Sequence, residues 1–218
     1  MKTTLSSSLP ADRFFRWTGI ASITAGFLYL ARQVFHPVDT LSSVTTSQWL
    51  IVQIFSIVMG ILAVIGLSGV YARQAHRTGV LGFIGYLLLS TFFAIATALY
   101  FMEAFIFPTL AGIAPGYVEG VQGLVNSQPS TIDLGGFPVA YTIVGISYLA
   151  GGILFGISIF RARVLPRWAG ILLAFGAIIT ILNAVIPHPA DRALALPVGL
   201  ALVWLGWALF NPQRSNAS

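Results

Sequence analysis

The chain has 218 residues, of which 57% are hydrophobic and only 8% are charged, and its formal net charge is +5. Soluble domains carry roughly 25% charged residues, and a soluble fold of this size cannot hide so much apolar surface from water. The basic residues stand in short clusters between apolar runs, which is typical of membrane topology and argues against a nucleic-acid partner. The chain contains no cysteine, which excludes thiolate metal sites, Fe–S clusters and disulfides.

Six apolar runs are each long enough for a helix that crosses a bilayer core of roughly 30 Å. In chain order they cover residues 15–35, 49–71, 80–107, 139–160, 169–186 and 193–210. We therefore expect an all-α polytopic membrane protein with a tail at 1–14, a six-helix transmembrane domain at 15–211 and a second tail at 212–218. The longest connection, 108–138, is rich in Gly, Pro and Ser, and a short helix is expected within it at 117–124.

The charges of the connections predict the orientation of these runs. Nine basic residues and one acidic residue fall in the two tails and in the connections that follow even-numbered runs. The opposite side holds two basic and five acidic residues. Cytoplasmic segments of membrane proteins carry the excess of Lys and Arg, so both termini are predicted to be cytoplasmic.

Two pairs of short motifs indicate an internal repeat. Residues 16–20 (RWTGI) open the first run and 167–171 (RWAGI) open the fifth, while 36–39 (HPVD) and 188–191 (HPAD) close the same two runs. Repeats of this kind arise from duplication of one structural unit, and the matching directions favour a parallel repeat. We expect three pseudo-repeated hairpins that pair the sixth run with the first, the second with the third, and the fourth with the fifth. The alternative to a duplication is that the motifs match by chance, because Arg-Trp is common at membrane interfaces and Pro is common at helix ends.

Arg32 and Glu103 are the two ionisable residues well inside the predicted spans, and each lies five residues before a proline that ends a run. Charges within a membrane span usually face a partner or a cavity. We expect a buried Arg32–Glu103 ion pair near the outer side, with Gln33 or Asn183 completing its hydrogen bonds. The pair either fixes helix registry alone or forms the floor of an outward-facing polar pocket.

His36 and His188 are expected just above this layer, and each is followed at three residues by an aspartate, Asp39 or Asp191. Two imidazoles and a carboxylate are suitable ligands for zinc or another transition metal. A bis-histidine haem is a less favoured alternative. The plain alternative is that both histidines face water at the membrane interface.

Three functions are compatible with these residues. The favoured one is a small-molecule or lipid-binding, transport-like protein, in which Arg32 holds the anionic head of an amphipathic ligand and the aromatic residues of the third run surround its apolar tail. The second is a metal-dependent membrane enzyme that uses His36 and His188. The third is a structural or regulatory membrane subunit without a ligand. No catalytic residue is assigned.

The opening residues Arg16, Gly19 and Ile20, the six-run plan and the length resemble bacterial multi-pass membrane proteins that are grouped only as domains of unknown function. This resemblance covers most of the chain. It implies the plasma membrane of a bacterium or archaeon, where membrane lipids surround the protein, and no established activity.

Overall fold

The computed structural model describes residues 11–125, 129–184, 186 and 190–211, and every regular element within these ranges is helical. The all-α class is therefore confirmed. In chain order the elements are α1 (Ala11–Phe35), α2 (Ser47–Phe105), α3 (Phe107–Ile113), α4 (Pro115–Val125), α5 (Phe137–Ala162), α6 (Arg167–Ile179), the 3-10 helices η1 (Thr180–Ala184) and η2 (Ala190–Ala195), and α7 (Leu196–Phe210). The helix expected at residues 117–124 is present as α4.

α2 is a helical hairpin, because its chain reverses at Gly79. This glycine has φ 55° and ψ −155°, a conformation outside the helical region. On either side of it the rings of Tyr71 and Tyr86 stack with their centroids 4.8 Å apart. Far from the turn, the indole Nε1 of Trp49 donates a hydrogen bond to the Glu103 carbonyl at 2.9 Å. One of these contacts lies close to the turn and the other at the far ends of the two segments. Both can form only if the segments 47–78 and 80–105 run antiparallel to each other.

The connection predicted at residues 72–79 is helical up to Thr78, so the second apolar run continues into a longer helix than expected. Ala, Arg and Gln, which dominate this stretch, are good helix formers. A single glycine then makes the reversal, because a residue without a Cβ adopts positive φ at little cost.

The pairs of packed helices close into a ring whose order follows the chain. α1 packs against α7 and against α2, α2 packs against α5, and α6 lies against both α5 and α7. The first half of α2 faces α1, since Gly66 lies against Ser22, and the second half faces α5, since Gly85 lies against Phe155. The three pairings expected from the sequence are thus present as packed neighbours, while their origin in a duplication stays a prediction.

Glycines allow α1 and α7 to approach each other closely. A Cβ at Gly206 would lie 2.6 Å from the carbonyl oxygen of Gly19, and a Cβ at Gly26 would lie 2.6 Å from the carbonyl oxygen of Gly199. Between these two contacts, the Ser22 hydroxyl donates to the Leu202 carbonyl at 2.8 Å. Small residues that bring helix backbones together are a common device of membrane helix packing.

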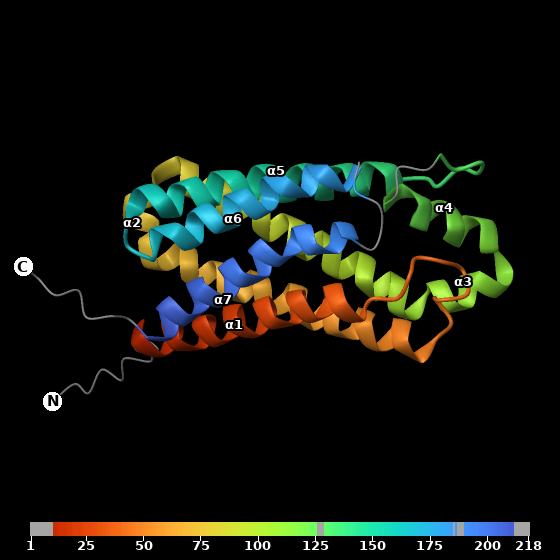
Figure 1. Cartoon of the computed structure of the whole chain (residues 1–218), viewed down its shortest axis with the longest axis horizontal. Coiled ribbons are helices and arrows are strands. Elements are labelled where there is room, and N and C mark those ends of the chain that lie inside the picture. The colour runs from red at the N-terminus through yellow and green to blue at the C-terminus, as the bar shows by residue number, and fades with distance from the viewer. Residues whose placement is uncertain (1–10, 126–128, 185, 187–189, 212–218) are drawn as a thin grey trace, which may run out of the picture.

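The core has two parts. The larger apolar cluster fills the ring and includes the fully buried Leu67, Phe93 and Leu202. A smaller cluster, in which Trp49 and Phe107 meet Val118 and Val121, joins α3 and α4 to one end of the bundle. α3 and α4 therefore form a cap at the end opposite to the start of α1 (Figure 1).

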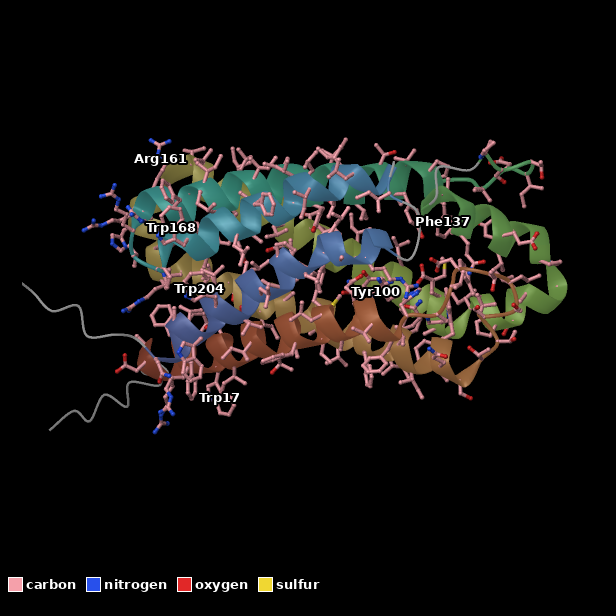
Figure 2. The ribbon with its side chains drawn as sticks, viewed as in Figure 1. Trp17, Tyr100, Phe137, Arg161, Trp168 and Trp204 are labelled. Atoms are coloured by element: carbon pink, nitrogen blue, oxygen red, sulfur yellow. The ribbon has the colours of Figure 1, made fainter. Side chains whose placement is uncertain are left out.

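Within the described residues, three helices are long and apolar enough to cross a membrane: Ser47–Phe105, Phe137–Ala162 and Arg192–Phe210. The shorter apolar segment Arg167–Leu182 accompanies them. Figure 2 shows Trp17, Arg161, Trp168 and Trp204 gathered at the end where α1 begins. Tryptophan is enriched at membrane–water interfaces, so the chain has the features of an integral membrane protein.

Candidate functional site

Arg32 lies in the last turn of α1, near the capped end of the bundle, and is held by the two halves of α2. Its Nε donates to the Ser56 hydroxyl at 2.9 Å, and Ser56 in turn donates to the Val52 carbonyl at 2.8 Å. The guanidinium lies over the ring of Tyr100, 4.9 Å from its centroid. The hydrogen bond to Ser56 and the cation–π contact with Tyr100 together fix the direction of the Arg32 side chain.

The two terminal nitrogens of Arg32 have no hydrogen-bond partner within the described part of the chain. Arg32 is half-buried. The fully enclosed polar atoms that lack a partner belong to other residues, so these two nitrogens still reach the accessible surface. A guanidinium in this state presents two donors to an anion or to water in a fixed geometry.

Glu103 lies one turn after Tyr100 on α2 and is half-buried. Its carboxyl group interacts electrostatically with Arg32 and with the hydroxyl of Tyr141 on α5. The direct ion pair expected from the sequence is wrong, because no Arg32–Glu103 pair within 4.0 Å exists among the described residues. Ser56 and the face of Tyr100 take the guanidinium instead, and the two charges share one polar layer without touching.

Two amide side chains, of Gln33 and Asn183, were expected beside Arg32 and Glu103. The Nε2 of Gln33 donates at 3.2 Å to the Tyr29 carbonyl of its own helix and not to the Arg32–Glu103 layer, and a ligand-binding role for Gln33 stays a prediction. A backbone carbonyl four residues earlier on the same helix is a common acceptor for a polar side chain within a helix. Asn183 falls in η1, but its side chain lies outside what the structure describes.

His36 is buried just beyond the end of α1, and both of its ring nitrogens are engaged. Nδ1 lies 2.7 Å from the Pro37 carbonyl oxygen and 4.0 Å from an Asp39 oxygen. Nε2 lies 3.3 Å from the Nε2 of the buried Gln53. The imidazole edge also packs against the ring of Trp49. These contacts fit a neutral histidine that donates through Nδ1 and accepts through Nε2.

The metal site predicted from the two HP motifs is not assembled by the described residues. Among them no three His, Asp or Glu side chains cluster as a metal would require. His36 and Asp39 do lie together, but the imidazole is committed to protein partners. His188 and the side chain of Asp191 lie outside the described residues, so their part in the expectation is untested.

Arg192 in η2, the 3-10 helix that precedes α7, completes this end of the bundle. Its guanidinium donates from one terminal nitrogen to the His36 carbonyl and from the other to the Pro37 carbonyl, the latter at 3.0 Å. A cation beside the last carbonyls of a helix satisfies orphan acceptors and the helix dipole. Arg192 thus ties the end of α1 to η2, just before α7.

Four residues of this polar layer were missed from the sequence: Ser56, Tyr100, Tyr141 and Gln53. Ser56 was indistinguishable from a serine that bonds only to its own helix, and Tyr100 stood in an aromatic stripe that predicted apolar packing. Gln53 carried the clearest signal, since an amide in the middle of an apolar run needs a polar partner. It has one at Nε2, while its enclosed Oε1 has none within the described residues.

The polar layer continues toward the middle of the bundle through tyrosines. The hydroxyls of Tyr29 on α1 and Tyr148 on α5 lie 3.5 Å apart, and Tyr148 also interacts with Thr180 in η1. Below this level the ring is filled by apolar side chains such as Phe93 and Leu67. The polar layer around Arg32 lies in the capped half, where Figure 2 shows Tyr100 surrounded by nitrogen and oxygen atoms.

A cavity of about 670 Å³ opens at the same end, between the 36–46 connection and the α3–α4 cap. Its lining includes Thr40, Ser42, Thr45, Ala111 and Glu119. None of the expected pocket residues is among those that line it. The accessible nitrogens of Arg32 and this cavity are separate features of the capped end.

Comparison with known proteins adds no relative, because no protein-family model, curated protein or solved structure matches the chain.

Proposed function

We propose that the chain is a six-pass membrane protein with both termini in the cytoplasm, and that its capped half binds a small amphipathic ligand with an anionic head group. The membrane arrangement rests on the folding of α2 into two antiparallel halves, 47–78 and 80–105, each longer than the ~20 residues that a helical crossing needs. With α1, α5, the α6–η1 segment and α7, this makes six crossings. The resemblance to uncharacterised bacterial membrane proteins agrees with this plan.

The charge distribution supports the orientation. In the described part of the chain, the end where α1 begins carries the basic residues Arg13, Arg16, Arg73, Arg77, Arg161, Arg163 and Arg167 with Asp12 as the acidic residue. The capped end carries Asp39, Glu103, Glu119 and Asp133 with Arg32 and Arg192. An excess of arginine marks the cytoplasmic side, so the cap faces outward.

The chain contains no cysteine, which makes the topology simple to test. Single cysteines at Ser42 in the capped end and at Arg161 in the opposite end both lie at exposed positions. A membrane-impermeant maleimide applied to intact cells should label Ser42→Cys and should label Arg161→Cys only after the membrane is opened. The reverse pattern would overturn the orientation, and labelling of both in intact cells would overturn the membrane crossing.

One observation carries the binding proposal: the two accessible terminal nitrogens of Arg32, fixed between Ser56 and Tyr100 in a half-buried layer. An arginine inside a membrane protein is costly unless it serves a partner or a cavity. Glu103, an acidic group that interacts electrostatically with Arg32, makes no hydrogen bond or ion pair with these nitrogens. A bound anion would complete the guanidinium, and a head group with an apolar tail fits a site surrounded by apolar helices.

Thermal unfolding of the purified protein in detergent tests this. Decyl phosphate should raise the midpoint, decanol should not, and the rise should disappear in Arg32→Gln. Arg13→Gln is the matched control, since it removes the same charge at the opposite end. If Arg32→Gln folds and keeps the full response, the binding proposal fails. If no anionic amphiphile shifts the wild-type midpoint, Arg32 serves helix registry, as in the structural alternative.

A further inference from the structure

A second groove lies at the opposite end of the bundle. It has a volume of about 390 Å³, within the roughly 300–1,000 Å³ of small-molecule sites. Three segments enclose it: the end of the first half of α2, the α5–α6 connection and the last turns of α7. Its lining is Arg73, Val164, Leu165, Pro166, Trp204, Trp207, Ala208 and Asn211.

The groove presents donors and one positive charge. Arg73 is exposed, and its guanidinium is placed 5.1 Å above the ring of Phe15 on α1. The indole N–H groups of Trp204 and Trp207 and the side-chain amide of Asn211 have no hydrogen-bond partner in the described part of the chain. Of the described residues that line the groove, none is acidic. Such a lining, with a guanidinium and no carboxylate, suits an anion.

An apolar track leaves this groove along α7. Leu196, Leu200, Trp204 and Trp207 are all exposed, the last at 57%. Their spacing of four, four and three residues places them on one face of the helix. The track runs from the groove toward the middle of the bundle, and a helix face this apolar is stable only against lipid or protein.

We propose that this groove binds the phosphate of an anionic phospholipid of the cytoplasmic leaflet, with an acyl chain lying on the α7 track. The inference rests on the proposed membrane orientation, and it concerns a site at the opposite end from Arg32. Basic pockets between helices on the cytoplasmic side recognise lipid head groups. The apolar track favours a lipid over free phosphate, because it offers a surface to an acyl chain. The described lining holds no carboxylate to pair with the cation of a zwitterionic head group, which favours an anionic head group.

Native mass spectrometry of the full chain released from detergent tests the proposal, with phosphatidylglycerol and phosphatidylcholine added in equal amounts. We expect phosphatidylglycerol to be retained preferentially, and Arg73→Gln to weaken its binding about fivefold, the effect of one arginine near an anionic head group. Arg73→Lys should keep most of the preference. Arg163→Gln is the control, because it removes an exposed arginine from the same end but outside the groove.

Three results would overturn the site. These are equal retention of the two lipids, an equal loss in Arg73→Gln and Arg163→Gln, and competition by glycerol phosphate as effective as that by the lipid. Should Arg73→Gln fail to fold, Trp204→Ala serves as the second variant, and an unchanged lipid preference there would equally contradict the site. Cysteine labelling reports the orientation separately, so a failure of the topology is distinguishable from a failure of the groove.

Discussion

The close approach of α1 and α7 predicts that replacing either of two glycines, Gly26 or Gly206, destabilises the protein even when the new residue is alanine. A methyl group at Gly206 would meet the Gly19 carbonyl oxygen at 2.6 Å, and one at Gly26 would meet the Gly199 carbonyl oxygen at the same distance. Ordinary contacts begin near 3.4 Å. Because the obstacle is backbone, no side chain can rotate away, and the helices must separate.

The required separation is roughly 0.8 Å, a gap that forfeits about a quarter to a half of the dispersion attraction of neighbouring contacts. Overpacking of this kind costs about 1–3 kcal/mol. Alanine recovers up to about 1 kcal/mol through its higher helix propensity. The net expectation for Gly26→Ala or Gly206→Ala is therefore a loss of up to about 2 kcal/mol in the free energy of unfolding.

Gly145 provides the matched control. It lies within α5, and a Cβ there would meet nothing within 4 Å. Gly145→Ala should therefore stabilise the protein by about 0.5–1 kcal/mol. The measurement is equilibrium unfolding by sodium dodecyl sulfate in mixed micelles. If all three variants shift stability in the same direction, the close approach of α1 and α7 is not what Gly26 and Gly206 provide.

Three further substitutions have defined outcomes in the same unfolding assay. Gly79→Ala should cost about 1–2 kcal/mol, because an L-residue is strained at φ 55° while nothing within 4 Å obstructs its Cβ; an unchanged midpoint would show that the hairpin turn is not held at positive φ. Gln74→Leu should stabilise by about 1–3 kcal/mol, since its fully buried amide has no partner at either atom in the described part of the chain; a loss of stability would instead reveal a bound water or ligand at this amide. Trp49→Phe should lose about 1 kcal/mol with the hydrogen bond to the Glu103 carbonyl, and an equal loss in Trp49→Ala would mean that packing contributes nothing there.

Much of the helical plan was predictable because it depends on local composition. A run of about 20 apolar residues forms a helix wherever lipid or a dry core surrounds it. Four of the six expected runs agree with the observed helices or their halves to within a few residues, while the second run, 49–71, continues as a helix to Thr78. The fifth run, 169–186, changes into 3-10 geometry at Thr180. The sequence predicted a connection over residues 72–79, because this stretch is polar. The stretch is helical up to Thr78, and Gly79 alone makes the turn.

The candidate site was predictable only in part. Arg32, Glu103 and His36 were recognisable as costly polar groups in apolar surroundings, and they do gather at the capped end. Their partners were not recognisable. Ser56, Tyr100 and Gln53 come from other helices, and nothing in the chain order states which hydroxyl or ring a guanidinium will meet.

The sequence by itself determined the class of the protein, the approximate helix boundaries and the separation of arginines from carboxylates. Each of these depends on composition within one segment. The tertiary structure alone decided which helix faces meet. It places Gly19 against Gly206 and Arg73 at the border of a groove. It also gives the Arg32 guanidinium a hydrogen bond to Ser56 and no ion pair with Glu103. The physical reason is that spans apolar on all sides have no preferred inward face, so their rotation about the helix axis is set by packing between segments far apart in the chain.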